Sequence, residues 1–479
     1  MPEPNPAPNP APNPALIPPP ATLVIFGITG DLSRRYLLPA LYHLSAAELL
    51  PGSFTVIGVT RRAAAPDDII QTLRGQLAAK GEQPDDAALG RLRAALVIRT
   101  MDLTSLDAYH GLRGQLDDLE TRAGACHNRL YYLSIPPGAY GPVVDLLGEA
   151  GLAGSCRHGR AESRLMVEKP FGFNYATAAE LIARLTAAFT ENQIYRIDHY
   201  LAKETAQNLL TFRAANPIFA AIWNRHTTSR ITVTSSEEIG IEGRAAFYEP
   251  VGALRDVVQN HLLQLLSLVA MEPPAAPTAE AIHAAKLRLL EDIAPIPPDA
   301  VAKLTVRGQY TGYRDEAANP HSIAETFARL HLSINNDRWR GVPVVVQNGK
   351  ALDRKTTEIT FEFSDPRLPE AGSNQLTFRL QPDEGIVIDL LAKRPGFADQ
   401  TERVEMSFKY QDSFAGHVRP DAYERVLLDG LRGDQTLFAS SAEILASWRI
   451  IDGVVAEWAK SGEGLAEYAP GTPPADIHP

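Results

Sequence analysis

The run RIDHYLAKE (residues 196–204) gathers a carboxylate, an imidazole, a phenol and an ammonium within nine residues. His199, Tyr200 and Lys203 can all donate hydrogen bonds to one anion. On a helix, the i to i+4 spacing of His199 and Lys203 would direct both side chains to the same side. A phosphate monoester suits such a cluster. Asp198 would repel that ligand, so we expect it to face elsewhere and to orient another group.

A second run, GALRDVVQNH (residues 252–261), opens an apolar helix and ends on His261. Taken alone, a histidine beside such a helix is more often a satisfied core residue than a catalytic one. Removing a hydroxyl proton while hydride leaves carbon needs a base whose pKa lies near the working pH, and a neutral imidazole suits this task. A carboxylate on its other nitrogen would fix the tautomer and stabilise the imidazolium. Asp198 is the unassigned acid, so we predict an Asp198–His261 dyad that folding brings together.

Two glycines follow the first apolar run of the chain. Residues 22–26 (TLVIF) are typical of a buried parallel strand, and Gly27 and Gly30 form the turn before a helix expected at residues 32–49. Glycine lets the backbone approach a pyrophosphate, and the helix N-terminus offers free N–H groups. The spacing is GxxGDL rather than GxGxxG, and glycine turns after strands are common. The position between the first strand and an amphipathic helix nevertheless favours a dinucleotide site.

The end of the second predicted strand (residues 54–59, FTVIGV) indicates which dinucleotide is bound. An NAD-specific site usually places an acid there to bind the ribose 2′-hydroxyl. Here the run continues with Thr60, Arg61 and Arg62, without an acid. Two guanidiniums suit a 2′-phosphate. We therefore expect NADP, with NAD as a secondary cofactor; the alternative is a pair of solvated arginines in a loop.

The composition narrows the class of protein. Lys and Arg total 46 and Asp and Glu total 57, a net charge of −11, which argues against a nucleic-acid partner. No apolar run is long enough to span a bilayer, and the N-terminus does not resemble a secretory signal. The two cysteines cannot form a disulfide framework and lack metal-ligand spacing, so we interpret both as small buried hydrophobes. A cytoplasmic enzyme without membrane or metal partners fits these observations.

Strand and helix patterns alternate from residue 21 to about residue 200. Residues 66–80 are predicted to be a helix, because a proline followed by two acids suits a helix N-terminus. Further strands are predicted at residues 95–99, 130–135 and 164–167. This alternation indicates a Rossmann-like, doubly wound α/β domain at residues 21–200. Residues 1–20 form a Pro/Asn/Ala tract that we predict to be a disordered Pro-rich tail.

Residues 201–479 are predicted to form a larger α+β domain. Its strands follow one another without regular helices between them, which favours a mostly antiparallel sheet. Helices near residues 260–271 and 423–431 would cover one face of that sheet. RIDHYLAKE lies at the predicted boundary, where active clefts are common. The strands are expected at residues 229–237, 330–334, 357–363, 376–381, 386–391 and 403–410.

Seven runs carry a family resemblance, in this order along the chain: FGITGDLSRR, EKPFG, RIDHYLAKE, GALRDVVQNHLLQ, QYTGY, QPDEGI and DAYERVLLDGLRGDQTLF. From about residue 22 to residue 456, the chain resembles glucose-6-phosphate dehydrogenases. The resemblance implies oxidation of glucose 6-phosphate at C1 to 6-phosphogluconolactone with production of NADPH, the first step of the oxidative pentose phosphate pathway. It also implies a homodimer or homotetramer, built through the sheet of the second domain.

The resemblance implies roles for individual residues as well. His261 would be the general base and Asp198 its partner, as predicted from the residues. His199, Tyr200 and Lys203 would bind the phosphate. The sugar hydroxyls would meet Lys169, Glu237, Asp256, Lys350 and Lys355. The cofactor would contact Gly27, Gly30, Asp31, Leu32, Arg61, Arg62, Pro136 and Lys169.

Three positions depart from the family pattern. Tyr36 stands where a lysine beside cofactor and substrate is common, so that cationic contact is missing or is supplied elsewhere. This departure bears on cofactor preference more than on the reaction. Ala202 replaces a common glycine, a benign change because alanine favours helix. The run Gln347-Asn348-Gly349 precedes Lys350 where RTG is common.

Two alternatives remain at this point. A catalytically silent paralogue that senses NADP or sugar phosphate would explain Tyr36 and the proline tail. Such a sensor would not need the base His261. A dehydrogenase of another sugar would explain the EKP run, which other sugar oxidoreductases share. The phosphate cluster argues against an unphosphorylated substrate.

Overall fold

The computed structural model describes residues 14–154, 161–363, 373–417 and 419–478. Most of the predicted Pro-rich tail therefore lies outside the described residues. The chain divides into two compact units. The first unit comprises Met1–Gly172, Ala176–Ala202 and Val418–Ser441, and the second comprises Phe173–Tyr175, Lys203–His417 and Ala442–Pro479.

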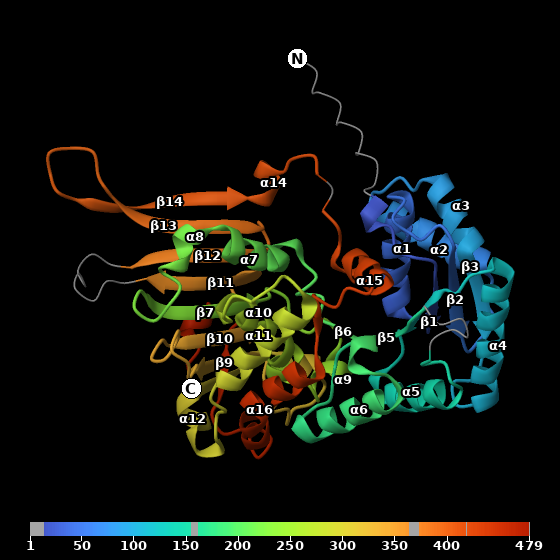
Figure 1. Cartoon of the computed structure of the whole chain (residues 1–479). Helices are drawn as coiled ribbons and strands as arrows, with labels where there is room; N and C mark the ends of the chain where they lie inside the picture. Colours follow the sequence, from blue (N-terminus) through green and yellow to red (C-terminus); the bar gives the residue numbers. More distant parts are fainter. Residues whose placement is uncertain (1–13, 155–160, 364–372, 418, 479) are drawn as a thin grey trace. The chain divides into compact units, whose positions relative to one another are not determined.

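The first unit contains a seven-stranded sheet with the order β15-β6-β5-β4-β1-β2-β3 (Figure 1). Its strands pair in parallel, except that β15 pairs antiparallel to β6. Each residue of the central strand β1 is buried, as expected for a parallel strand covered on both faces. The strands are β1 (Ala21–Phe26), β2 (Phe54–Thr60), β3 (Leu96–Thr100), β4 (Asn128–Leu133), β5 (Ser163–Val167), β6 (Ile194–Ile197) and β15 (Phe438–Ala439).

Helices connect these strands. A π-helical segment, η2, leads from the glycine turn into α1, and α2 begins at Pro66 with Asp67 and Asp68 in its first turn, as predicted. α1 packs against α2, α3 and α15, whereas α4 packs against α5. The bounds are η2 (Ser33–Leu37), α1 (Leu38–Ala46), α2 (Pro66–Ala79), α3 (Asp86–Ala95), α4 (Leu106–Ala123), α5 (Tyr140–Glu149), α6 (Tyr175–Ala188) and α15 (Ala422–Arg432).

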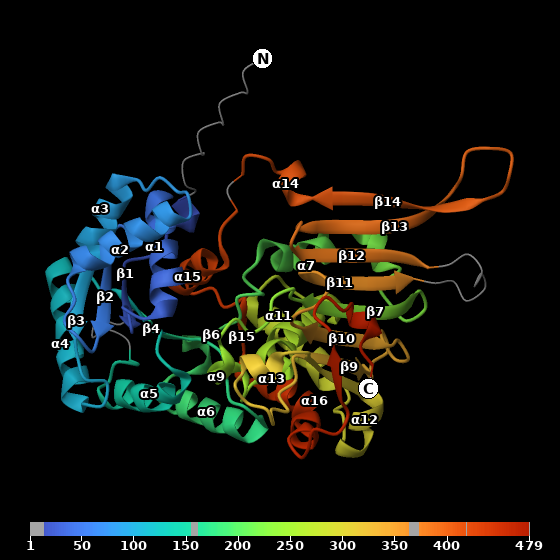
Figure 2. The ribbon, with the colours of Figure 1, turned by 180° about the vertical axis from the view of Figure 1, so that it is seen from behind.

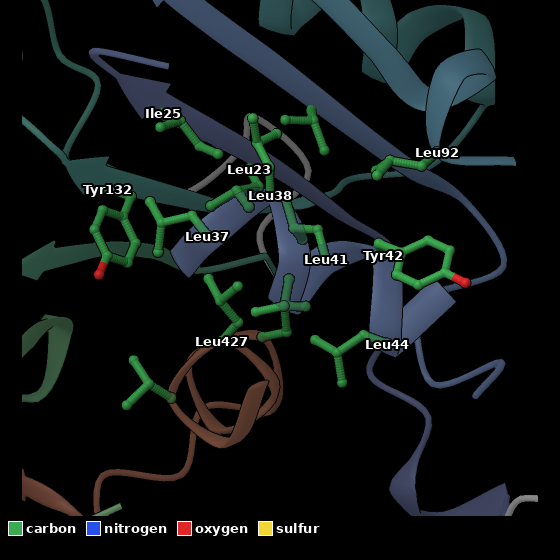
Figure 3. Close-up of a cluster of buried hydrophobic side chains, with 14 of the residues drawn as sticks. Leu23, Ile25, Leu37, Leu38, Leu41, Tyr42, Leu44, Leu92, Tyr132 and Leu427 are labelled. Carbon is green, nitrogen blue, oxygen red and sulfur yellow. The ribbon is translucent and has the colours of Figure 1, made fainter. Parts of the chain in front are cut away.

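A buried apolar cluster joins β1, η2, α1 and α15 (Figure 3). Leu37 and Leu41 point towards Leu23 of the strand, and Leu427 reaches the same cluster from α15. The prediction that residues 423–431 cover the second sheet was therefore wrong. That segment is a helix, but its buried leucines complete the core of the first unit, because they are complementary to apolar side chains nearly 400 residues away in the sequence.

The second unit contains a nine-stranded sheet with the order β14-β13-β12-β11-β7-β10-β9-β8-β16 (Figures 1 and 2). The pairs β7–β10 and β8–β16 are parallel and the other pairs are antiparallel. The strands are β7 (Thr228–Ser236), β8 (Thr305–Tyr310), β9 (Phe327–Leu332), β10 (Val344–Gly349), β11 (Thr356–Phe363), β12 (Asn374–Gln381), β13 (Gly385–Lys393), β14 (Thr401–Lys409) and β16 (Leu465–Tyr468).

Helices of the second unit include a buried pair with continuous helical backbone. The π-helical segment η5 runs straight into α10, and all residues of α10 are buried. η5 packs against β7, β9 and β10, and α10 against α7 and α11. The bounds are α7 (Glu204–Ala215), α8 (Pro217–Ala220), α9 (Ala245–Tyr248), η5 (Leu254–Leu262), α10 (Leu263–Ala270), α11 (Ala279–Asp292), α12 (Val301–Leu304), α13 (Tyr313–Glu316), α14 (Tyr410–Ser413) and α16 (Ser441–Trp458).

The predicted fold class is confirmed, since a doubly wound parallel sheet precedes a mostly antiparallel one. The interpretation of the cysteines was wrong for Cys126, which is only partly buried and is disulfide-bonded. Cys156 lies outside the described residues. Among the described helices, none has both the length and the apolar character that crossing a membrane requires.

Candidate functional site

The turn after β1 brings backbone close to backbone at the predicted dinucleotide site. The N–H groups of Gly27 and Ile28 both donate to the carbonyl of Val59, at 3.0 and 3.2 Å. Gly27 has a φ of +87°, and a Cβ added to it would lie 2.3 Å from the carbonyl oxygen of Ser134. A side chain is therefore excluded there for two independent reasons, the left-handed backbone and the lack of space.

A cavity of about 740 Å³ opens beside this turn. Of the residues predicted to contact the cofactor, Gly27, Gly30, Arg61, Arg62 and Pro136 line it. The two arginines follow the end of β2 and are exposed, so their guanidiniums are available to an anion. The remaining lining residues are Thr29, Val59, Thr60, Asp102, Leu103, Thr104, Ser134, Ile135 and Ala139.

Asp31, Leu32 and Lys169, also predicted as cofactor contacts, are not among the lining residues. Asp31 is exposed and pairs with Arg35 at 3.4 Å. Conversely, Asp102 and Thr104 line the cavity and were not predicted. The carboxylate of Asp102 accepts hydrogen bonds from both the backbone N–H and the hydroxyl of Thr104. Their position just after a parallel strand could have indicated a role in ligand binding, because ligands bind at the carboxyl ends of such strands.

The EKPFG run follows β5 and places a buried acid beside Lys169. Glu168 is only 9% exposed, and the hydroxyl of Tyr132 donates to its Oε1 at 2.5 Å. Burial raises the pKa of Glu168 to about 7, although the Tyr132 hydroxyl and the charge of Lys169 act in the opposite direction. Lys169 itself is half-buried. The carboxyl group next to this predicted substrate contact therefore titrates near neutrality.

Tyr36 occupies the position where the family pattern has a cation. Its ring is 42% exposed and stacks on the ring of Tyr423 in α15, with centroids 4.9 Å apart. Tyr423 also hydrogen-bonds to Glu168. The position thus presents a stacked aromatic pair in place of an ammonium group.

RIDHYLAKE does not form the helix on which the spacing argument for His199 and Lys203 relied. Its first residues end β6, a turn follows, and α7 begins only at Glu204. The i to i+4 prediction was therefore wrong. In the turn, the carboxylate of Asp198 accepts the backbone N–H of Tyr200 at 2.9 Å. Asp198 is 4% exposed, so this acid is buried and held by its own turn.

The two aromatic members of the predicted phosphate cluster lie in contact. The rings of His199 and Tyr200 meet edge to face, with centroids 4.9 Å apart. Both residues belong to the first unit, whereas Lys203 belongs to the second. The ammonium of Lys203 donates a hydrogen bond to the side-chain oxygen of Gln381, at the end of β12. Gln381 was not predicted as a site residue, although it opens the QPDEGI run that contributed to the resemblance.

His261 lies in η5 and is 1% exposed. Its backbone N–H donates to the side-chain oxygen of Asn260 at 2.6 Å. π-Helical turns are rare and are frequent at functional sites. Asp256, one turn earlier in the same segment, is half-buried. The predicted base thus lies in a π-helical segment of the second unit and is buried there, whereas the predicted partner Asp198 lies in a turn of the first unit.

Two of the predicted sugar contacts form an ion pair. The ammonium of Lys350 lies 2.8 Å from Oε2 of Glu237, and the lysine side chain is only 3% exposed against 28% for the glutamate. Adjacent strand ends explain the pairing, because Glu237 follows β7, Lys350 follows β10, and these strands are parallel neighbours. Lys355, the other predicted lysine, is exposed.

Comparison with known proteins decides the family. Residues 24–208 match the family description "Glucose-6-phosphate dehydrogenase, NAD binding domain", and residues 210–476 match "Glucose-6-phosphate dehydrogenase, C-terminal domain". The chain belongs to the glucose-6-phosphate dehydrogenase family. The predicted family is thereby confirmed.

Individual relatives of the dehydrogenase cover nearly its whole length. It is 37% identical to glucose-6-phosphate 1-dehydrogenase of Chlamydia muridarum, over 95% of this chain and 93% of that protein. It is 38% identical to glucose-6-phosphate 1-dehydrogenase 2 of Mycobacterium bovis, over 95% and 91%. A solved glucose-6-phosphate dehydrogenase in complex with glucose 6-phosphate superposes with a TM-score of 0.88 at 30% identity, covering 95% and 96%. This dehydrogenase is therefore an oxidoreductase with an N-terminal dinucleotide-binding domain.

Proposed function

We propose that this dehydrogenase oxidises C1 of glucose 6-phosphate with NADP, with His261 as general base and Asp198 as its partner. The observation that carries the cofactor assignment is the cavity beside Gly27, which pairs a glycine turn with two exposed guanidiniums. The substrate is proposed from the family and from the relative solved with glucose 6-phosphate.

The residues fit the cofactor. The turn at Gly27 and Gly30 allows the close backbone approach that a pyrophosphate needs, and Arg61 and Arg62 would bind the 2′-phosphate of the adenosine ribose. NAD would lose that contact and bind more weakly. When bound, NADP supplies the hydride acceptor.

His261 removes the proton from the C1 hydroxyl while the C1 hydrogen leaves as hydride, so that a C=O bond forms and the lactone results. Burial in η5 keeps the imidazole in one orientation, which lowers the entropic cost of reaction. The Asp198 carboxylate accepts the hydrogen bond of the other ring nitrogen and stabilises the imidazolium formed. The turn that fixes Asp198 through the Tyr200 N–H supports this role.

The proposed substrate contacts form two groups, one that binds the phosphate and one that binds the sugar hydroxyls. His199, Tyr200 and Lys203 donate hydrogen bonds to the phosphate, and the bond from Lys203 to Gln381 shows that this ammonium has a defined direction. The sugar hydroxyls can accept from lysines and donate to carboxylates. Those contacts are assigned to Lys169, Glu237, Asp256, Lys350 and Lys355.

The decisive experiment is steady-state kinetics of the purified protein with glucose 6-phosphate and NADP, followed by NADPH absorbance. We expect turnover, a higher kcat/KM with NADP than with NAD, and little reaction with unphosphorylated glucose. Binding of both ligands without NADPH formation would overturn the proposal and favour a sensing protein. Turnover of glucose at the same kcat/KM would instead reassign the phosphate cluster.

We also propose that the dehydrogenase is a homodimer or a homotetramer assembled through the second sheet. β14 is the edge strand of that sheet and is exposed almost throughout, including Val404 and Met406 at 41% and 60% exposure. Exposed apolar edge strands are ready sites for association. Sedimentation of wild-type protein and of Met406→Lys tests this, because a charge on the strand should shift the assembly towards the monomer.

A further inference from the structure

A cluster of tyrosines surrounds the turn that carries Lys350. Tyr310 contacts Tyr313 and Tyr468 edge to face, Tyr248 contacts Tyr313, and Phe327 contacts Tyr468. All five residues are buried and belong to one apolar core cluster of the second unit. We call these residues the tyrosine cluster.

The backbone of the turn is tied to the C-terminal segment of the chain. The hydroxyl of Tyr468 donates to the carbonyl of Lys350 at 2.7 Å, and the N–H of Gly471 donates to the carbonyl of Ala351 at 2.9 Å. Ala351 has a φ of +51°, a left-handed conformation that is unfavourable for a residue with a Cβ. The turn therefore needs external contacts to remain in this conformation, and the C-terminal segment supplies two of them.

The side chain of Lys350 is directed by a second tyrosine. Its Nζ lies 5.6 Å from the ring centroid of Tyr248, within the range of a cation–π contact, and pairs with Glu237. The hydroxyl of Tyr248 is buried and has no hydrogen-bond partner among the described residues. The ring of Tyr248 therefore contacts the ammonium, while its hydroxyl makes no compensating bond there.

We propose that Tyr468 and Tyr248 are positioning residues for Lys350, the first through the backbone of its turn and the second through its ammonium group. The inference rests on the proposed function, in which Lys350 contacts the sugar. Lysine has four rotatable side-chain bonds, so an ammonium held by a ring, a carboxylate and a fixed backbone reaches the substrate at a lower entropic cost. Tyr468, the last residue of the C-terminal strand β16, thereby supports substrate recognition.

The test of Tyr468 is Tyr468→Phe, with Tyr310→Phe as matched control. Both variants remove a buried hydroxyl of the tyrosine cluster, but that of Tyr310 bonds to Glu316 and to the Ile241 N–H rather than to the Lys350 turn. The Tyr468 hydroxyl bonds to the Lys350 carbonyl and also to the Thr326 hydroxyl, so each variant loses two hydrogen bonds. We expect Tyr468→Phe to raise KM for glucose 6-phosphate roughly 3- to 10-fold, the effect of the lost bond to the Lys350 turn. KM for NADP should stay unchanged in both variants.

The test of Tyr248 is a pair of substitutions. Tyr248→Phe keeps the ring and removes an unbonded hydroxyl, so KM should stay at the wild-type value. Tyr248→Leu removes the ring and should raise KM about tenfold, as expected for a desolvated cation–π contact. Equal effects of the two substitutions, or equal effects of Tyr468→Phe and Tyr310→Phe, would overturn the inference.

Amide hydrogen exchange separates this inference from the proposed function, because it needs no activity. Peptides that contain residues 349–352 should exchange faster in Tyr468→Phe than in wild-type protein or in Tyr310→Phe. If wild-type protein does not oxidise glucose 6-phosphate, the proposed function fails, and exchange still tests how the turn is held. If the protein is active and exchange is unchanged in Tyr468→Phe, the inference alone fails.

Discussion

Glu237 and Lys350 form an ion pair across the ends of two parallel strands, with 2.8 Å between Oε2 and Nζ, although they are 113 positions apart in sequence. Both are predicted to contact the sugar, and the bond joins their charged side chains directly. The pair fixes the ammonium before substrate binds, because Lys350 is almost completely buried and its charge needs a partner.

Removing the carboxylate should therefore destabilise the second unit. Glu237→Gln leaves the Lys350 ammonium buried beside a neutral amide, and we expect a loss of about 2 kcal/mol in the free energy of unfolding. Urea unfolding at neutral pH measures it. Asp353→Asn, an exposed acid in the same turn, is the control and should change the free energy by less than about 0.5 kcal/mol. Equal stability of the two variants would show that the pair does not stabilise the fold.

Loss of the proposed base should affect turnover more than binding. His261→Ala should lower kcat by roughly 10²- to 10⁴-fold and leave KM for glucose 6-phosphate nearly unchanged, because the proton is transferred only in the transition state. Lys203→Ala should show the opposite pattern, a raised KM with a smaller loss of kcat. His331→Ala, an exposed histidine on β9, is the control. Unchanged kcat in His261→Ala would remove that residue from its role.

The sequence predicted those parts of the fold in which local pattern and tertiary environment agree. The run TLVIF (residues 22–26) predicts a buried parallel strand, and every residue of β1 is buried. Pro66 and the two acids after it mark the start of α2. In both cases the residues that determine the local structure are adjacent in sequence, so periodicity and capping preferences suffice.

The predictions were wrong where contacts between residues distant in sequence determine the structure. RIDHYLAKE contains good helix formers, yet its first residues extend β6, because pairing with β5 and β15 outweighs local propensity. The α15 helix was recognised, but it belongs to the first unit through Leu427 and its neighbours. The pairing of Glu237 with Lys350 depends on the order of strands β7 and β10, which no local pattern reveals.

The predicted cofactor contacts rest on residue types that the chemistry requires. Gly27 and the arginines after β2 line one cavity, and their contact with a cofactor stays a prediction. Gln381 and the tyrosine cluster were not predicted as site residues, because glutamine and tyrosine are common in structural roles and their proposed roles depend on residues distant in sequence.

The buried acid of the EKPFG run should make the stability of the first unit depend on pH. Burial raises the pKa of Glu168 to about 7 from an ordinary value of 4.5. The raised pKa means that its contribution to stability is complete below about pH 4.5 and is lost as the pH rises through about 7. Glu168→Gln does not titrate there. From about pH 5 to pH 8, the free energy of unfolding of wild-type protein should fall by about 2 kcal/mol relative to that of this variant. Urea unfolding measures the difference.

The control for that measurement is Glu149→Gln, an exposed acid at the end of α5. The difference in free energy of unfolding between this variant and wild-type protein should stay constant over the same pH range. A constant difference for Glu168→Gln as well would show that this carboxyl group does not titrate near neutrality.

His43 in α1 bridges two carboxylates of the first unit and should make the stability of this unit depend on pH in the alkaline range. Its Nδ1 lies 2.7 Å from Glu424, and its Nε2 lies 2.8 Å from Glu82. The hydrogen bond to Glu424 has the largest effect, and together the two bonds raise the pKa of His43 to about 9. The raised pKa means that the stabilisation is complete below about pH 6.5 and is lost as the pH rises through about 9. His43→Gln removes the charge at every pH. Because the imidazole is one-third exposed, screening limits the effect to about 1 kcal/mol.

Thermal unfolding of wild-type protein and His43→Gln at roughly pH 6 and pH 10 measures this bridge. The wild-type advantage should be present at the lower pH and absent at the higher one. His110→Gln serves as control, because His110 is exposed on α4 and should show no such change. An advantage that persists undiminished at the higher pH would mean that a neutral imidazole, which can donate to only one of the two carboxylates, stabilises the fold as well as the imidazolium does.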